Sequence, residues 1–199
     1  TLVRADDAGA KEPALLLEAG KLYRRTGALK DARAAFDRLV TEYPDAPSAF
    51  EGTILLARTM YEDGQVQKAL ERLEDLSTAM LGRPQRLPVL VALGEIYSDL
   101  GLHQAVIKEY SEIAASTSEP ELLAKAATAL LGEEAWDLGL SVARRVEVAN
   151  LSDSTAYNFL IEYGKALLRV DAQQGLDKME QAYERYPSAR TQAGDLQLM

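Results

Sequence analysis

Few side chains in this sequence are of the types that perform chemistry, and none has the spacing that a catalytic or metal site needs. The chain of 199 residues contains one His, His103, and no Cys. His103 follows Gly101-Leu102 at the expected start of a helix, without an orienting partner or a nucleophile nearby in the sequence. Because a catalytic base normally works with such partners, we predict that His103 is an exposed turn residue. One imidazole without any thiolate also supplies too few ligands for a transition-metal site.

Two pairs of adjacent acids and one Gly-Lys pair were the remaining candidates. Asp6-Asp7 and Glu133-Glu134 are neighbours in sequence, and neighbours on a helix point about 100° apart, so neither pair is arranged to share a proton. We expect Glu133-Glu134 to open a helix, where negative charge is favoured. Gly164-Lys165 is not a phosphate loop, because Phe159 and Ala166 stand where that motif needs Gly and Ser or Thr. The sequence therefore predicts a protein that is not an enzyme and that holds no cofactor and no metal.

The overall charge excludes some classes of partner. The net charge is −9 and the pI is about 4.8, whereas nucleic acid requires a concentrated positive face. The longest apolar runs fall well short of the roughly 20 residues of a membrane span, so we expect no membrane insertion. No signal-peptide pattern is present, but the chain starts at Thr1, which is compatible with a removed leader. Bacterial periplasm or envelope and cytoplasm both remain open as compartments.

The strongest pattern in the sequence is a repeat of 37 residues. Small residues recur at Gly20, Ala57 and Gly94, and glycines recur at Gly27, Gly64 and Gly101. Four further columns keep the same step with residues of matching size: Tyr23, Met60 and Tyr97; Ala32, Ala69 and Val106; Phe36, Leu73 and Tyr110; Leu39, Leu76 and Ile113. Self-similarity at a period of about 20 to 50 residues is typical of repeat architectures.

Each repeat is predicted to consist of two helices joined by a short turn. Apolar residues at helical spacing predict a first helix from about Pro13 to Thr26, which Gly27 ends. A second helix is expected from Asp31 to Tyr43, because the following proline disfavours helix at Tyr43. Such units cannot bury their apolar faces alone, so we expect them to stack into a solenoid. The expected repeats span about 13–47, 50–84, 87–120, 121–150 and 156–187, and the fourth, with helices at 121–131 and 134–150, is the least regular.

The first repeat resembles the tetratricopeptide motif, whose spacing is kept by Leu16, Gly20, Tyr23, Ala32, Phe36 and Pro44. The resemblance covers roughly residues 13–189. It implies an all-α fold, a right-handed α-solenoid of about five helix-turn-helix repeats. The Tyr-Pro-Asp-Ala-Pro turn at 43–47 is similar to that of bacterial repeats in envelope-associated scaffold proteins. Residues 1–12 are expected to be a tail or the remnant of a preceding helix, and residues 188–199 a C-terminal cap or the truncated end of a longer array.

The resemblance also indicates where a partner would bind, because in this family the first helices of successive repeats line a concave groove. The matching positions here are Leu17, Lys21, Arg24, Ile54, Arg58, Tyr61, Val91 and Glu95, with Arg25 beside them. Arg can hold a carboxylate through two parallel hydrogen bonds, so one hypothesis is that a peptide with an acidic segment or a free C-terminus docks at these cations. The alternative is that the cations are ordinary surface charges paired with Glu18 and Glu62.

Two functions follow from these observations. The leading prediction is a non-catalytic scaffold or adaptor that binds a protein or peptide in the groove. The alternative is a structural assembly subunit, a homo-oligomer that self-associates through the ends of the solenoid. Groove binding predicts exposed apolar surface at Ile54, Tyr61 and Val91, whereas self-association predicts it at Leu196–Met199 or within the first twelve residues.

Overall fold

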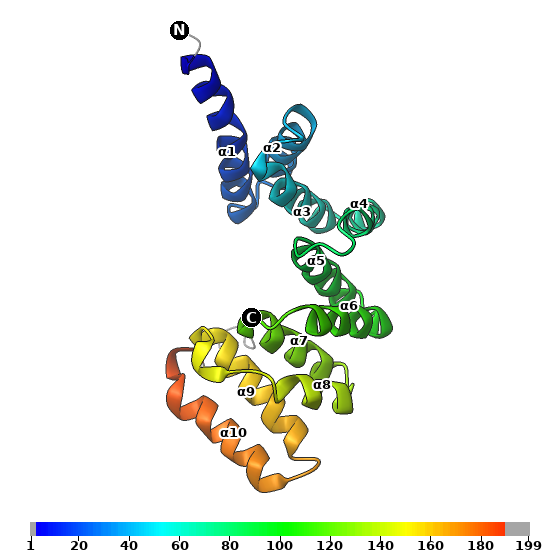
Figure 1. The fold of residues 1–199 in the computed structure, drawn as a ribbon, viewed down its shortest axis with the longest axis vertical. Helices are drawn as coiled ribbons and strands as arrows, with labels where there is room; N and C mark the ends of the chain where they lie inside the picture. The colour runs from blue at the N-terminus through cyan, green and yellow to red at the C-terminus, as the bar shows by residue number, and fades with distance from the viewer. Residues whose placement is uncertain (1–2, 190–199) are drawn as a thin grey trace. The chain divides into compact units, whose positions relative to one another are not determined.

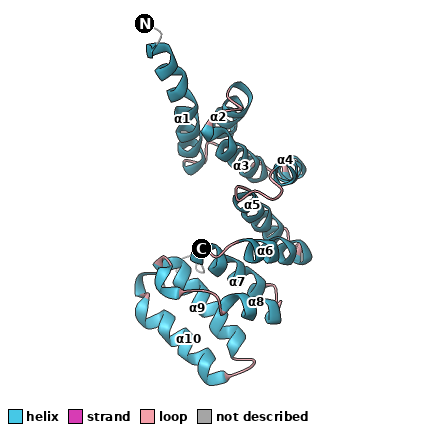
Figure 2. Ribbon diagram, in the orientation of Figure 1, coloured by secondary structure: helices cyan, strands magenta, loops and turns pink. Residues whose placement is uncertain are grey.

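The computed structural model describes residues 3–189, with side chains from Lys11 onward, and all of the regular elements in this range are helices (Figure 1, Figure 2). The all-α fold expected from the sequence is confirmed. The first five helices are α1 (Val3–Arg25), α2 (Leu29–Glu42), α3 (Pro47–Glu62), α4 (Val66–Ala79) and α5 (Arg86–Asp99). The others are α6 (His103–Ser116), α7 (Pro120–Gly132), α8 (Trp136–Ala143), α9 (Asp153–Leu167) and α10 (Ala172–Arg185), with a 3-10 turn at Val148–Asn150.

The chain divides into two compact units, with the boundary between Ile96 and Tyr97. In the first unit α2 packs against both α1 and α3, α3 packs against α4, and α1 also contacts α3. In the second unit α7 contacts α6, α8 and α9, and α9 packs against α10. The consecutive helices α1 to α4 are therefore neighbours in space in the first unit, as are α6 to α10 in the second.

The core of the first unit forms around Phe36, which is fully buried in α2. Residues 32, 36 and 39 lie on one face of a 3.6-residue helix, and Ala32, Phe36 and Leu39 are all buried there. Leu17 of α1 and Leu56 of α3 complete the same cluster. The apolar stripe of α2 is thus covered by α1 on one side and by α3 on the other.

Helix α1 begins at Val3, ten residues before the predicted start at Pro13. The residues that precede the proline include Ala5, Ala8, Ala10 and Lys11, which are strong helix formers. Proline removes one backbone donor and usually disfavours a helix interior, yet the helix continues through Pro13 here. In the segment expected to be a tail or a remnant helix, the backbone of residues 3–12 forms the beginning of α1. The cap expected at 188–199 lies almost wholly outside the described residues.

The turn inside each of the first three repeats requires a backbone that L-residues rarely adopt. Gly27, Gly64 and Gly101 have φ of 76°, 79° and 67°, in the left-handed region that glycine enters at no steric cost. The fourth turn has Glu134 in this role, with φ of 58°. The prediction that Glu133-Glu134 opens a helix is therefore wrong, because α8 starts only at Trp136 and both acids belong to the turn.

The second helix of the fourth repeat is also shorter than the predicted 134–150. Helix α8 ends at Ala143. Just beyond it, the guanidinium of Arg145 donates to the carbonyl oxygens of Ala114 (2.8 Å) and Thr117 (3.0 Å), where α6 ends. These long-range bonds satisfy carbonyl groups that lack partners at a helix C-terminus, and no local sequence rule indicates them.

Candidate functional site

The predicted groove residues come from α1, α3 and α5, the first helices of three repeats, and all of them lie in the first unit. The column formed by Leu17, Ile54 and Val91 is almost entirely buried, with exposures of 7 %, 8 % and 8 %. The apolar surface expected at Ile54 and Val91 is therefore absent, and the prediction of exposure at these two residues is wrong. The three residues therefore belong to the buried core.

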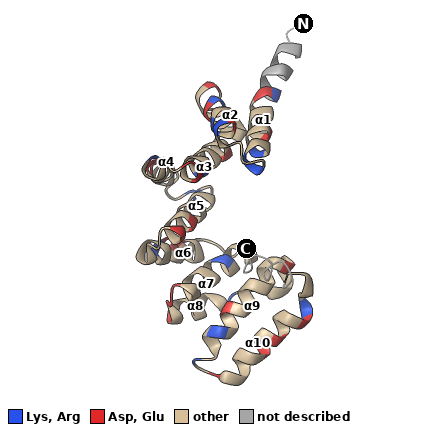
Figure 3. Ribbon diagram, turned by 180° about the vertical axis from the view of Figure 1, so that it is seen from behind, with Lys and Arg blue, Asp and Glu red and all other residues tan. Residues whose placement is uncertain are grey.

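The charged column one turn further on remains accessible. It consists of Lys21, Arg58 and Glu95, which the 37-residue step aligns, and all three are half-buried. Tyr61 is also half-buried. The last turn of α1 contains Arg24 and Arg25, and Figure 3 shows Lys and Arg residues at this end of the helix. The structure thus gathers basic side chains at the end of α1, beside α3.

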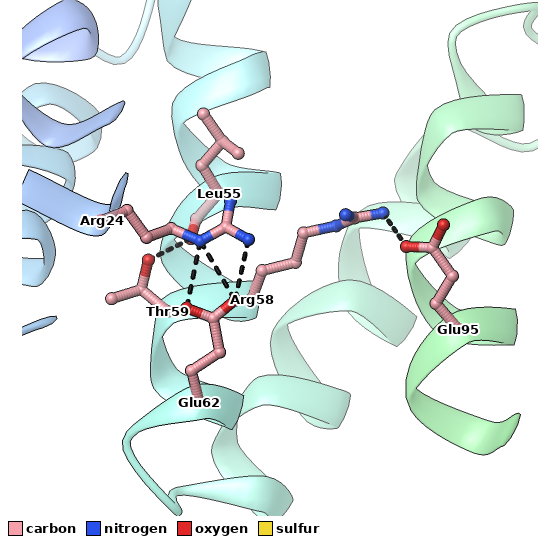
Figure 4. A network of polar contacts seen from close by, with 6 residues as sticks. All are labelled: Arg24, Leu55, Arg58, Thr59, Glu62 and Glu95. Atoms are coloured by element: carbon pink, nitrogen blue, oxygen red, sulfur yellow. Dashed lines mark hydrogen bonds and ion pairs between the residues drawn. The ribbon is translucent and has the colours of Figure 1, made fainter. Parts of the chain in front are cut away.

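Arg24 is held by Glu62 of α3 (Figure 4). Its Nη2 lies 2.7 Å from Oε1 of the carboxylate, and its Nε lies 3.1 Å from both Oε1 and Oε2. Side-chain exposures of 27 % for Arg24 and 36 % for Glu62 place the pair at the edge of water. Charge-assisted bonds of this geometry join the first two repeats directly.

The two cations of the charged column, Lys21 and Arg58, are also paired with carboxylates. Arg58 donates to Glu95 of α5, one repeat further along (Figure 4). Lys21 lies 2.8 Å from Glu51 of α3 and 3.1 Å from Glu18 on its own helix. The hydrogen bonds that Lys21 donates to Glu51 and then to Glu18 raise the pKa of Lys21 above its ordinary value. These contacts agree with the alternative drawn from the sequence, in which the cations pair with Glu18 and Glu62.

A pocket of about 480 Å³ lies where these side chains meet. Its lining consists of Glu18, Lys21, Arg24, Arg25, Leu55 and Glu62. Three cations and two carboxylates therefore surround a single apolar side chain. Arg25 is exposed and has no carboxylate partner among the described residues. A ligand can therefore bind the guanidinium of Arg25 directly. It can bind Arg24 and Lys21 only after their present carboxylate partners are displaced.

Two residues of α3 that the sequence did not indicate also belong here: Leu55 lines the pocket and Glu51 pairs with Lys21. Both belong to α3, and the residue types at their repeat positions do not indicate a role. Glu51 pairs with Lys21, which stands thirty residues earlier in the sequence, so the contact arises from helix packing and not from local spacing.

His103, the one histidine, has a partner that the sequence did not indicate. Its Nδ1 lies 2.5 Å from Oε2 of Glu133, thirty residues further along, in the turn between α7 and α8. The His103 side chain is 72 % exposed, so its predicted place on the surface is confirmed. Within the described side chains no cluster of three His, Asp or Glu is placed to hold a metal ion. Nor does any helix in that range have the length and apolarity to cross a bilayer.

Comparison with known proteins identifies the first repeat. The model of the tetratricopeptide repeat family matches residues 14–46, the segment formed by the end of α1 and the whole of α2. A search of curated proteins found no match. Among solved structures, the "nearly identical TPR-like repeats" of a putative kinesin light chain from Podosopora anserina superpose with a TM-score of 0.66 and 21 % identity. This match covers 90 % of the present chain and 96 % of the other. Residues 14–46 therefore match a tetratricopeptide repeat, and the chain shares the fold of solved structures that contain such repeats.

Two further solved structures share this fold. BtubC from P. vanneervenii has a TM-score of 0.68 at 15 % identity, covering 96 % of this chain and 85 % of that one. YrrB, described as "a TPR protein with an unusual peptide-binding site", has a TM-score of 0.60 at 14 % identity, covering 94 % and 93 %. Identities this low establish the fold alone, and with it the α-solenoid class expected from the sequence.

Proposed function

We propose that this tetratricopeptide repeat protein is a non-catalytic adaptor whose first unit binds a protein or peptide carrying an acidic segment. The observation that carries the proposal is the pocket between α1 and α3, where Lys21, Arg24 and Arg25 converge around Leu55. Cations beside an apolar side chain suit a peptide that presents carboxylates next to an apolar residue. The pocket lies at positions that the family uses for ligands, which supports the same assignment.

Arg25 is the natural first contact for such a ligand. It is exposed and has no ion-pair partner in the described part of the chain, whereas Lys21 and Arg24 are already bonded to Glu51 and Glu62. An incoming carboxylate can therefore bind Arg25 without breaking an existing ion pair. The fold is compatible with peptide binding, since the solved structure of YrrB is described by its peptide-binding site.

The experiment that tests this function is a titration of the full chain against a fluorescein-labelled, acetylated hexapeptide of alternating Asp and Glu. A hexapeptide of alternating Asn and Gln serves as the uncharged match. We expect binding of the acidic peptide alone, and a loss of about fivefold or more in affinity for Arg25→Glu, because one attractive charge becomes repulsive. Lys30→Glu is the matched control, since Lys30 is an exposed cation of α2 outside the pocket. Equal loss in both variants would indicate nonspecific attraction and contradict the proposal.

A second candidate function, self-association through an end of the solenoid, is favoured by one observation on α1. Leu15 and Leu22 are 67 % and 52 % exposed. The 37-residue step aligns them with Gly52 and Thr59 of α3, which are buried. Gly52 packs against Leu39 and Val40 of α2, whereas no helix of the described residues covers the equivalent face of α1 as α2 covers α3. A second copy of this chain would continue the same interface.

Sedimentation equilibrium over a range of concentrations tests this second candidate. We expect the unmodified chain to associate and the Leu15→Glu/Leu22→Glu variant to remain monomeric. Leu81→Glu is the control, because Leu81 is 70 % exposed but lies in the loop after α4. A monomeric unmodified chain at the highest concentration reached would rule out this function.

A further inference from the structure

The groove already contains carboxylates in the places that a ligand's carboxylates would take. The guanidinium fork of Arg24 uses both Nε and Nη2 on Glu62, the two-point geometry by which Arg recognises a carboxylate. Glu62 also lines the pocket itself. A ligand carboxylate that is to reach Arg24 through this fork must displace Glu62.

The same relationship recurs one repeat further along. Arg24 of α1 is bonded to a glutamate of α3, and Arg58 of α3 is bonded to Glu95 of α5 (Figure 4). In both pairs the cation comes from the first helix of one repeat and the acid from the first helix of the next. Two consecutive steps of the groove are therefore each occupied by an acid of the protein's own.

Both pairs are accessible enough to exchange. The side chains of Arg24 and Arg58 are 27 % and 29 % exposed, and those of Glu62 and Glu95 are 36 % and 35 % exposed. Ion pairs in contact with water typically contribute only a factor of about two to five to an equilibrium constant. Such a contact is weak enough to be displaced by several carboxylates acting together, but it offsets most of what one carboxylate would gain.

We propose that Glu62 and Glu95 are internal competitors that set the ligand class of the groove. While they hold Arg24 and Arg58, a segment with one carboxylate gains little beyond Arg25. A segment with several adjacent carboxylates displaces both glutamates and binds more cations at once. Specificity is a difference between affinities, and here the repulsive element disfavours weakly acidic partners. This inference rests on the proposed function, since it concerns the same ligand and the same groove.

The test compares two labelled peptides on the full chain by fluorescence anisotropy. One is the acidic hexapeptide described above, and the other carries a single central Glu among Asn and Gln. The variants are Glu62→Gln, Glu95→Gln and their combination, which remove the competing charge and keep the side-chain size. Glu42→Gln is the matched control, because Glu42 holds Arg38 at 2.9 Å on α2, outside the pocket. Thermal melts of each variant report whether the fold is retained.

We expect each groove variant to tighten the acidic hexapeptide about three- to fivefold and the combination about tenfold, with the control unchanged. The affinity of the single-Glu peptide should increase by a larger factor than that of the acidic hexapeptide. The ratio of the two affinities should therefore become smaller. Binding by the double variant alone, with none by the unmodified chain, would support the inference. If the unmodified chain binds and Arg25→Glu does not, yet Glu62→Gln and Glu95→Gln leave the affinity unchanged, the competitors are refuted and the proposed function stands. If neither the unmodified chain nor the double variant binds either peptide, both proposals are wrong.

Discussion

The ring of Phe36 in α2 lies directly against the backbone of Gly20 in α1. A Cβ atom added at Gly20 would come within 2.4 Å of Cε1 and 2.7 Å of Cζ of this ring. Phe36 is fully buried, so the ring has no free space into which it could turn. The pair explains why the repeat carries a small residue and an aromatic residue in these two columns, and it sets how closely α1 approaches α2.

The first prediction concerns this contact. Gly20→Ala should lower the free energy of unfolding by about 1–3 kcal/mol, because the added methyl overpacks the helix crossing. Urea denaturation followed by circular dichroism measures the change. Gly132→Ala is the control, since a Cβ at Gly132 meets nothing within 4 Å, and it should be neutral or slightly stabilising. Adding Phe36→Leu to Gly20→Ala should cost less than the two separate effects combined, and strict additivity would argue against the contact.

The left-handed turn residues lead to a pair of opposite predictions. Gly64→Ala should destabilise the protein by about 1–2 kcal/mol through the backbone alone, because φ is 79° and the space around Gly64 is open. Glu134→Gly should stabilise it by about 1 kcal/mol, since glycine adopts the φ of 58° without strain. Thermal melts of the two variants test the signs, and a shift in the same direction for both would contradict the shared turn geometry.

The column of small residues in the second helices provides another test. Ala69 of α4 is fully buried and is aligned by the repeat with Ala32 of α2. Ala69→Leu should cost about 1–3 kcal/mol of unfolding free energy, because a well-packed helix crossing cannot accept three more carbons. Ala34→Leu, on the exposed face of α2, should leave the denaturation midpoint almost unchanged. A neutral Ala69→Leu would show that the register of the second repeat is wrong.

The pairing of Arg58 with Glu95 changes what a charge reversal should do. Without a partner Arg58→Glu would leave stability almost unchanged, but next to Glu95 it brings two carboxylates together. We expect a loss of about 0.5–1 kcal/mol, since the pair is partly exposed and therefore screened. The charge swap Arg58→Glu/Glu95→Arg should recover most of the loss in a denaturant titration. Failure of the swap to recover stability would mean that the pair does not join the repeats.

The second unit contains an acid whose titration should be visible. Burial alone would raise the pKa of Glu121, but hydrogen bonds from Thr155 and from the backbone and side chain of Ser152 outweigh it and hold this pKa below its ordinary value of 4.5. A carboxyl with a depressed pKa in the folded state stabilises the fold above its unfolded pKa and loses this contribution as the pH falls through the folded pKa. The contribution is therefore present at neutral pH and decreases below about pH 4.5.

Denaturation of the unmodified chain and of Glu121→Gln at pH 7 and near pH 3 measures this linkage. The unmodified chain should be the more stable of the two at pH 7, and the difference should shrink at the acid end. A difference that stays constant with pH would show that Glu121 does not supply the effect.

The sequence by itself determined the fold class and the register of the first three repeats. The physical reason is that a helix of 3.6 residues per turn converts apolar spacing into one buried face, as at Ala32, Phe36 and Leu39. The glycine turns were equally readable, because few residues other than glycine adopt a positive φ at Gly27 or Gly64. The turn of the fourth repeat was harder to predict from the sequence, because Glu134 adopts this conformation although it is not glycine.

Only the tertiary structure decided which charges face one another. Arg24 and Glu62 stand 38 residues apart, and Arg58 and Glu95 stand 37 apart, so the pairs exist only once the first helices lie side by side. The same packing buries Leu17, Ile54 and Val91, which the sequence placed in an open groove. Helical spacing specifies the face on which a residue lies, but the neighbouring helix decides whether that face meets solvent, an apolar core or an opposite charge.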